Sequence, residues 1–315
     1  MTITIREVDP QHDYERVAEI INFYEPDPVT ADQLRGSGTD KLAGQIVAVN
    51  ANGLVMGYGS AGRSTWMRAG HFMVSALVDP AYCRQGIGTR LHESNVSFAR
   101  EQGAVALETW VFDDRAESLR FAEKHGFKVE RHIFESTIDL HSFDPTPFAG
   151  LVEGVEASGI RFASIAEVGN THESRQKLWE INRAISLDMP NSTGEVSSFD
   201  EFEKMCETSK SFREDGQLLA LDGERYIGLS RVAHLKETNS AYNQMTGVLP
   251  EYRGRKIAQA LKLLSIRTAK SWGVDYIRTN NDSENGPILA INRKLGYAAE
   301  PGGYRMIRQL EREPS

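Results

Sequence analysis

The chain has 315 residues with a formal net charge of −8, and 40% of its residues are hydrophobic. A single core usually stops growing below this length, so we expect a globular protein with two domains of about 150 residues each. The negative charge argues against a nucleic-acid partner, and no stretch approaches the roughly 20 apolar residues of a membrane span, so no membrane contact is expected.

The cysteines and histidines also exclude some classes of site. Cys83 and Cys206 are the two cysteines, and no CxxC motif is present. Both are therefore expected to be free thiols in a reducing compartment. No HExxH motif or other metal spacing occurs among the eight histidines, so no metal site is expected. The N-terminal residues have neither a basic start nor an apolar run, which predicts a cytoplasmic protein.

The first half of the chain predicts two short helices, then a strand, a turn and a longer helix. Hydrophobic spacing places the short helices at Asp13–Phe23 and Thr30–Arg35. The apolar run at 71–78 is typical of a buried strand, and Pro80 marks a turn after it. An amphipathic helix follows this turn, and Gly103 is the expected end of that helix.

Residues 141–159 are rich in proline, glycine and other small residues. Such a composition between two strand-like runs is typical of a domain boundary. We expect an N-terminal domain at 1–145, a linker at 146–159 and a C-terminal domain at 160–315.

The second half predicts the same kinds of element in the same order. Helices are expected at Arg175–Ile185 and at Ser198–Lys210, the second with a Ser or Asp cap. A hairpin is expected to turn at Asp222 and Gly223. A strand, a proline-bearing turn and an amphipathic helix ending near Gly273 come next.

The similarity of the two halves can be measured directly. Shifted by 170 positions, the chain matches itself without a gap from Val78 against Val248 to Gly126 against Gly296. An insertion in either copy would break this register, so the copies must share element lengths and a fold. We predict an α/β (α+β) protein with two tandem domains, each a mixed twisted sheet flanked by helices.

The turn before the long helix is suited to binding an anion in both copies. A helix that begins after a glycine-containing turn points unpaired N–H groups and the positive end of its dipole at one spot. Gly86 and Gly88 let a phosphate approach the backbone, and Arg84 can add a charged hydrogen bond. Arg253 and Arg255 can do the same in the second copy. A diphosphate is the expected occupant.

These residues resemble the acyl-CoA loop of the GCN5-related N-acetyltransferases (GNAT), written [Q/R]-x-x-G-x-[G/A]. The later motif Asn-x-x-Ala-x-x-Leu-Tyr-x-x-x-Gly-Phe of that family is similar to Arg115–Phe127 and to Asn285–Tyr297. The resemblance covers both halves, and the tandem layout is similar to that of the mycothiol synthase branch.

The resemblance implies acetyl-CoA as co-substrate, with contacts to both copies. The thioester carbonyl is expected near the end of one strand in each copy, at Val78 or Val248, with the pantetheine between splayed strands. The loop residues expected to bind acetyl-CoA are Arg84, Gln85, Gly86, Ile87, Gly88 and Thr89 in the first copy, and Arg253, Gly254, Arg255, Lys256, Ile257, Ala258 and Asn285 in the second.

Each copy departs from the family pattern in a different place. In the first copy, Cys83 stands at the leading basic position and Arg115 at the position of the downstream Asn. In the second copy, Lys256 occupies the first glycine position, which is tolerable if its φ stays negative. The tyrosine that protonates the thiol in this family is replaced by Ala122 and Asn292.

No catalytic side chain carries over from the family, because the usual general base is absent as well. Glu108 is the candidate base, on a strand expected to line the acceptor side, where partial desolvation would suit a carboxyl to base work. The alternative is a solvent-facing residue on an alternating strand, with water relaying the proton. Trp110 and Phe112, on the same strand, are interpreted as core residues.

The sequence therefore favours an N-acetyltransferase in which the primary amine of a small molecule attacks acetyl-CoA directly. The alternative is a catalytically degenerate pair of domains that senses acyl-CoA or holds a partner protein. The identity of the amine, the acyl length and the working half stay open, and the protein is expected to be a monomer with pseudo-dimeric symmetry or a homodimer.

Overall fold

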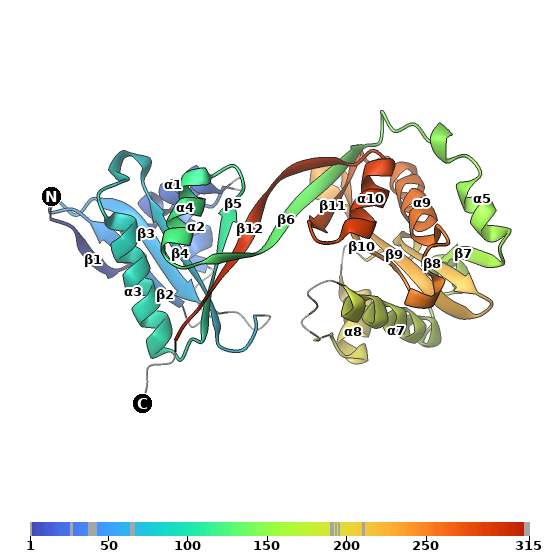
Figure 1. Ribbon diagram of the computed structural model, residues 1–315, viewed down its shortest axis with the longest axis horizontal. Helices are drawn as coiled ribbons and strands as arrows, with labels where there is room; N and C mark the ends of the chain where they lie inside the picture. Colours follow the sequence, from blue (N-terminus) through green and yellow to red (C-terminus); the bar gives the residue numbers. More distant parts are fainter. Residues whose placement is uncertain are drawn as a thin grey trace. The chain divides into compact units, whose positions relative to one another are not determined.

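The computed structural model describes residues 2–25, 28–36, 43–63, 67–189, 192, 194, 196–209 and 212–311. They form two compact units. The first unit holds the chain up to Arg131 together with the residues from Gly303 onward, and the second holds His132–Gly302. Each unit is an α/β structure with a mixed sheet and flanking helices, as predicted (Figure 1).

The first unit contains most elements of the first half of the chain. They are β1 (Thr4–Glu7), α1 (Tyr14–Tyr24), α2 (Ala31–Gly36), β2 (Ala43–Val49), β3 (Val55–Gly62), β4 (His71–Val78), η1 (Pro80–Tyr82), α3 (Ile87–Glu101), β5 (Ala106–Phe112) and α4 (Ala116–Lys124). The strand order is β1-β2-β3-β4-β5, with β12 (Ala298–Gln309) beside β5. Within this order only β4 and β5 pair in parallel.

Two apolar layers cover the faces of the first sheet. Val17 and Ile20 of α1 pack against Val47 on one face. Ala99 of α3 and Ala122 of α4 pack in a separate cluster on the other. Each helix is therefore held on the sheet by a stripe of buried apolar residues, which the 3.6-residue helical period places on one face of the helix.

The second unit repeats this plan with elements of the second half. They are η2 (Thr146–Phe148), α5 (Leu151–Glu156), β7 (Ile160–Ser164), α6 (Ile165–Val168), α7 (His172–Asp188), α8 (Phe199–Thr208), η3 (Glu214–Gly216), β8 (Gln217–Asp222), β9 (Arg225–Leu235), η4 (Lys236–Thr238), β10 (Ser240–Val248), η5 (Pro250–Tyr252), α9 (Ile257–Ser271), β11 (Tyr276–Asp282) and α10 (Gly286–Lys294). The strand order is β7-β8-β9-β10-β11, with β6 (Lys128–Asp139) beside β11.

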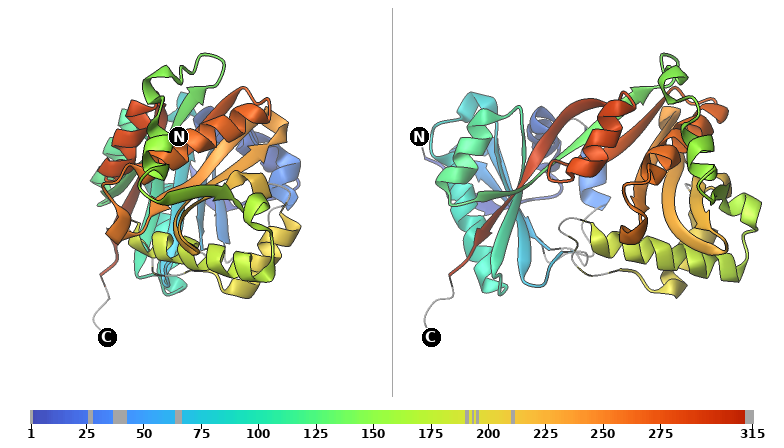
Figure 2. Two further views of the ribbon diagram at one scale, coloured as in Figure 1. Left: turned by 90° about the vertical axis from the view of Figure 1, so that its right-hand side faces the viewer. Right: turned by 45° about the vertical axis from the view of Figure 1, so that its right-hand side comes forward.

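Helices cover both faces of the second sheet as well. Figures 1 and 2 show α9 and α10 on one face of strands β8, β9 and β10, and α7 and α8 on the other. Leu261 and Ile266 of α9 lie in the first layer, and Leu178 and Ile181 of α7 lie in the second.

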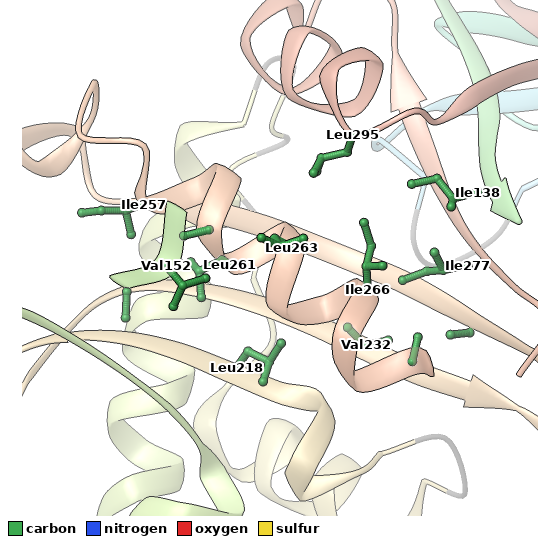
Figure 3. Close-up of a cluster of buried hydrophobic side chains, with 14 of the residues drawn as sticks. Ile138, Val152, Leu218, Val232, Ile257, Leu261, Leu263, Ile266, Ile277 and Leu295 are labelled. Atoms are coloured by element: carbon green, nitrogen blue, oxygen red, sulfur yellow. The ribbon is translucent and has the colours of Figure 1, made fainter. Parts of the chain in front are cut away.

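The last strand of each sheet comes from the other half of the chain. In the first unit, Gly303–Gln309 of β12 pair antiparallel with β5. In the second unit, Ile133–Asp139 of β6 pair antiparallel with β11. In Figure 3, Ile138 of β6 lies near Ile277 and Leu295 in the core of the second unit. The two halves therefore exchange their final strands, and each unit needs both halves to complete its sheet.

The units differ from the domain boundaries expected at 1–145 and 160–315. The difference arises because β6 continues past Arg131 into the second unit, and β12 returns to the first unit at Gly303. The expected linker at 146–159 contains α5, and its Val152 is buried in the core of the second unit, where Figure 3 shows it next to Leu261. A segment rich in glycine and proline is thus a packed helix with its own apolar contacts.

The other elements expected from the pattern are present. The early helices of the second half are α7 and α8, and Ser198 caps α8 by accepting a hydrogen bond from the Glu201 N–H. The end of α8 expected at Lys210 lies outside the described residues. The hairpin of β8 and β9 turns with Gly223 at a φ of +58°, a left-handed conformation that favours glycine.

Candidate active site

Strands β4 and β5 of the first unit separate partway along their length. They pair from His71 against Ala106 to Met73 against Glu108 and no further. The residues beyond this point on both strands line a cavity of about 1260 Å³. Half of the backbone groups of a strand point toward each neighbour, so the separated part of β4 presents a row of such groups to this cavity. The opening is therefore suited to holding an extended ligand by backbone hydrogen bonds.

The N-terminus of α3 opens into the same cavity. Of the residues expected to bind acetyl-CoA in the first copy, Val78, Arg84, Gly86, Ile87, Gly88 and Thr89 all line it, whereas Gln85 does not. A Cβ at Gly88 would lie 3.4 Å from the Phe121 ring, so glycine keeps the first turn of α3 accessible between β4 and α4. A diphosphate and an extended chain attached to it could occupy one continuous space.

Both copies of the loop have the same unusual backbone. In the first copy, Arg84 and Gly86 have φ values of +62° and +80°, and in the second, Gly254 and Lys256 have +76° and +63°. A negative φ, the condition under which Lys256 was considered tolerable, is therefore not met. Each copy places one glycine and one basic residue in left-handed positions, in opposite order. A side chain in this conformation costs about 1–3 kcal/mol, so the loop shape is maintained against a local penalty.

The carbonyl at the end of the strand before the loop, β4 in the first unit and β10 in the second, accepts a hydrogen bond from a different side chain in each unit. In the first unit, the Tyr24 hydroxyl donates to the Val78 carbonyl at 2.6 Å, and burial, with the nearby Cys83, raises the pKa of Tyr24 to about 12. In the second unit, the Arg253 guanidinium donates to the Val248 carbonyl at 3.4 Å and pairs with Asp188 at the end of α7.

Tyr24 and Asp188 both end the first long helix of their unit, and each contacts the residue at the leading position of the loop. The first copy has Cys83 in place of the basic residue, and there the Tyr24 hydroxyl donates to the equivalent carbonyl instead. Asp188 is engaged with Arg253 and is not a free site for a cationic amine.

His92 of α3 lies at the inner end of the first cavity. Its side chain is buried among Phe121, His125 and Phe127. Burial, together with His125 and Arg308, lowers the pKa of His92 to about 4. The imidazole is therefore neutral at pH 7. The Arg308 guanidinium donates to Nε2 at 3.3 Å, and this contact assigns the ring proton to Nδ1.

Glu108 does not line the cavity. Its carboxylate is buried, with 1% of the residue exposed, and it accepts hydrogen bonds from His71 Nδ1 at 2.6 Å and from the Arg305 guanidinium at 3.0 Å. These contacts tie β4, β5 and β12 together. The solvent-facing alternative is wrong, because the residue is buried. The carboxyl is also engaged by two partners away from the cavity, which leaves it poorly placed for base work.

Trp110 and Phe112 are not core residues, contrary to the interpretation of the sequence. Both line the cavity, and Trp110 is 38% exposed. They project from the face of β5 opposite to Val111, which is buried against α4. Arg115, at the position of the family Asn, caps the N-terminus of α4 and also lines the cavity.

Polar side chains connect the corresponding strands of the second unit. Strands β10 and β11 pair from Ser240 to Tyr242 and then separate, as β4 and β5 do. At this point Thr279 Oγ1 donates to the Asn243 carbonyl at 3.0 Å. Lys262 Nζ donates to Asn292 Oδ1 at 2.6 Å, and the Asn292 amide donates to Asn281 Oδ1 at 2.7 Å.

This polar network, consisting of Asn243, Lys262, Thr279, Asn281 and Asn292, is buried. Lys262 and Asn292 occupy the positions of His92 and Ala122 in the repeat. Val248 ends β10, the loop from Arg253 leads into α9 at Ile257, and Asn285 is the N-cap residue of α10, without a side-chain cap hydrogen bond.

Comparison with known proteins identifies the family. The family model described as Acetyltransferase (GNAT) family matches residues 11–127 and 178–297. The chain belongs to this family. The match covers both halves, and the GNAT acetyltransferases are enzymes, so the chain is an N-acetyltransferase with two tandem GNAT domains.

Several mycothiol acetyltransferases are similar to this GNAT protein. The one from Stackebrandtia nassauensis is 27% identical over 84% of this chain and 82% of its own length. The one from Amycolatopsis mediterranei is 23% identical over 81% of each chain. A solved GNAT structure from Sphaerobacter thermophilus covers 98% of this chain and 95% of its own with a TM-score of 0.70 at 20% identity. A tandem GNAT protein from the clavulanic acid pathway covers 99% and 100% with a TM-score of 0.62 at 18% identity.

The cavity residues of this GNAT protein that the sequence analysis missed include Phe23, Tyr24 and His92. Phe23 and Tyr24 belong to no recognisable motif, so no signal in the sequence marked them as site residues. His92 had one, because it and Lys262 are titratable residues at matching positions on helices whose neighbouring stripes are apolar. Among the described residues, no helix is long and apolar enough to cross a membrane, and no three metal-ligating side chains gather in one place.

Proposed function

We propose that the protein transfers the acetyl group of acetyl-CoA to the primary amine of a small molecule, in the cavity of the first unit. The observation that supports this is the meeting of two features in one space. The separated edge of β4 and the N-terminus of α3 both face the cavity of about 1260 Å³. An acyl thioester attached to a diphosphate needs both features.

The loop between β4 and α3 would hold the diphosphate. The first N–H groups of α3 have no partner inside the helix, and its dipole adds positive potential there. Arg84 lies at the surface of this loop, where it pairs with Glu117 of α4 at 2.5 Å. Its side chain can turn to the diphosphate, since both partners are exposed and such a pair is weak in water.

The acetyl thioester supplies an electrophilic carbonyl, and the chain must polarise it and position the amine. Backbone N–H groups on the separated part of β4 can donate to the carbonyl oxygen as charge develops there. The amine nitrogen forms a bond to the carbonyl carbon, the carbon–sulfur bond breaks, and the thiolate leaves. The proton lost by the amine passes to water, because Glu108 is engaged by His71 and Arg305.

His92 is suited to stabilise the departing thiolate. It is a buried, neutral imidazole that lines the cavity, and so does Ala122, the position where the family carries a tyrosine. With Nε2 accepting from Arg308, the Nδ1–H is the group available to donate. A neutral imidazole can donate a hydrogen bond to a developing anion without giving up its proton, so His92 would act as an electrostatic group.

The second unit would serve mainly as a scaffold. Its loop has the same backbone as the first, yet the polar network joins β10 to β11 and fills the position of Ala122 with Asn292. This arrangement favours, for that unit alone, the alternative of a catalytically degenerate domain. It still supplies β12 to the first unit through the strand exchange.

A pair of matched substitutions tests the proposal. Gly88→Leu and Ala258→Leu place the same side chain at equivalent positions of the two loops. Acetyl-CoA binding is measured by calorimetry, and coenzyme A release with a panel of primary amines is measured by chromatography. The proposal expects Gly88→Leu to weaken binding at least about 10-fold, because a side chain there meets Phe121. Loss of turnover only from Ala258→Leu would move the site to the second unit, and no release with any amine would reject the acetyltransfer.

A further inference from the structure

Three aromatic side chains line the cavity of the first unit. Phe23 of α1 and Trp110 and Phe112 of β5 all line it. Phe23 is 50% exposed and Trp110 is 38% exposed, although large aromatic residues are usually buried. We call these three residues the aromatic wall. Apolar area that stays exposed inside a cleft is typical of a surface that binds an apolar partner.

The rings of the aromatic wall are held by their neighbours. The rings of Trp110 and Phe112 lie edge to face with centroids 6.2 Å apart, and Phe23 contacts Tyr24 in the same way at 5.1 Å. Tyr24 is itself anchored to the Val78 carbonyl. A rigid aromatic surface loses little entropy when a ligand binds to it, so the arrangement is ready to bind as it stands.

The indole of Trp110 lies directly against the exchanged strand β12. A Cβ added at Gly303 would come within 2.5 Å of the indole ring. Gly303 pairs with Phe112 in the ladder, and Arg305 pairs with Trp110 itself. Glycine at this position therefore leaves room for the indole beside β12, and Trp110 lines the cavity from there.

One charged pair lies beside the aromatic wall. The Arg115 guanidinium lies 3.4 Å from the Asp114 carboxylate and 5.9 Å from the centroid of the Phe23 ring. The ring faces of the aromatic wall themselves offer no hydrogen-bonding group to a ligand that lies on them. An acceptor covered with hydroxyl groups would lose its water there and gain few partners in return. A flat apolar acceptor would gain the contact area without that loss.

We infer that the acceptor of the first unit carries its primary amine on an aromatic or other flat apolar body, and that Trp110 selects it. This inference rests on the proposed function, since it assigns the acceptor of the same site. The apolar body lies on the aromatic wall, and the amine points toward the separated edge of β4. The product is the N-acetyl amide of an arylalkylamine-like molecule, with coenzyme A as the other product.

Competition between two amines tests the inference on the full chain. 2-Phenylethylamine and glucosamine are compared as acceptors by chromatography of coenzyme A and the acetylated products. The wild type should prefer 2-phenylethylamine in kcat/KM. Trp110→Ala should lower kcat/KM for this amine by about 10- to 100-fold, with little change for glucosamine and unchanged calorimetric binding of acetyl-CoA. The matched control is Asn280→Ala, at the equivalent exposed position of the second unit, which should change neither value.

Two further variants keep a folding defect apart from loss of selection. Trp110→Phe should recover part of the preference, because it restores a flat ring. Gly303→Ala keeps tryptophan at position 110, but the added methyl group displaces the indole ring. This variant should therefore show the same selective loss of kcat/KM for 2-phenylethylamine. A preference of the wild type for glucosamine, or an equal effect of Trp110→Ala on both amines, would overturn the inference.

Binding without turnover separates this inference from the proposed function. Protein saturated with coenzyme A is titrated with 2-phenylethylamine, and tryptophan fluorescence is followed in the wild type and in Trp110→Phe. A saturable signal in the wild type that Trp110→Phe lacks supports the inference even if no amine is acetylated. If 2-phenylethylamine does not bind while glucosamine is acetylated, the inference fails and the proposed function stands.

Discussion

The two units of this protein share a backbone design and differ in what occupies it. In both, a parallel pair of strands separates after three residue pairs, and a loop with two left-handed residues leads into a long helix. In the first unit the space beside the separated strands is a cavity lined by aromatic rings and His92. In the second, buried polar side chains link the same strands. The two units therefore share the separated strands and the loop, whereas a few side chains determine what lies between the strands.

The largest effect should come from the exchanged strands. Met306 of β12 is fully buried in the core of the first unit, and Ile138 of β6 is buried in the core of the second. Met306→Asp places an unpaired charge in the first unit and should lower its free energy of unfolding by more than about 4 kcal/mol. Ile138→Asp should do the same to the second.

Hydrogen-exchange mass spectrometry, read separately over α3 and α9, measures both variants. The effects should cross, so that a change near the end of the sequence unfolds the first unit and a change in the first half unfolds the second. If each substitution instead loosened the unit built from its own half of the sequence, the strand exchange described for this chain would be wrong.

Lys262 should make the stability of the second unit depend on pH. Burial lowers its pKa from 10.5 to about 7 in the folded protein. Below pH 7 the folded and unfolded states both hold the proton, and the folded state carries the full cost of the buried ammonium. Between pH 7 and 10.5 only the unfolded state keeps the proton, so the free energy of unfolding should rise by about a few kcal/mol.

The variant Lys262→Met should remove this rise, and Lys270→Met is the control because Lys270 is exposed on the same helix. Hydrogen exchange in α9 at pH values from 6 to 10, corrected for intrinsic exchange rates, provides the measurement. If the free energy of unfolding rose with pH in Lys262→Met as it does in the wild type, a group other than Lys262 would be responsible for the rise.

His92 should affect turnover more than binding. Replacing it by Leu removes the donor at the inner end of the cavity, and kcat should fall by about 10- to 100-fold with a smaller change in the KM for acetyl-CoA. Burial lowers the pKa of His92 to about 4, so the residue stays neutral from pH 5 to 8. The dependence of kcat on pH over that range should therefore be the same in His92→Gln as in the wild type. His92→Gln should recover part of the rate, since its amide can donate. A normal rate in His92→Leu would remove this residue from the mechanism.

The smallest effect should come from the left-handed residues of the two loops. Lys256→Gly relieves a strained φ of +63° and should raise the stability of α9 by about 0.5–1 kcal/mol, whereas Gly86→Lys introduces the same strain in the first unit and should cost about 1 kcal/mol. Thermal unfolding followed with hydrogen exchange distinguishes the units. Equal and opposite changes would show that the loops are interchangeable, and destabilisation by Lys256→Gly would mean that the lysine side chain contributes more than its strain removes.

Much of the fold follows from the pattern of residues, because a repeat with constant spacing carries helices, strands and turns together. The loop at Gly86 and the helix after it were predictable from local chemistry. The strand exchange was not, since β6 and β12 have the same length and either could pair beside β5. Local preference cannot decide between two equivalent partners.

The side chains of the site were harder to predict than its backbone. Glu108 and Trp110 lie two positions apart on β5 and share a face, yet one is buried by His71 and Arg305 and the other is exposed to the cavity. Alternation on a strand says which face a residue occupies, but the sheet here is covered on both faces. Burial then depends on neighbours from β4 and β12, which are distant in sequence.

The strand exchange also sets an order of events during synthesis. The sheet of the first unit cannot reach its final pairing when Arg131 leaves the ribosome, because Gly303–Gln309 have not yet been made. At roughly 5–20 residues per second, β5 waits on the order of 10–35 s with an unpaired edge, the kind of edge on which other chains add strands. A ribosome that stops early therefore releases a chain without the last strand of the first unit, and that unit is complete only after translation has passed the second unit.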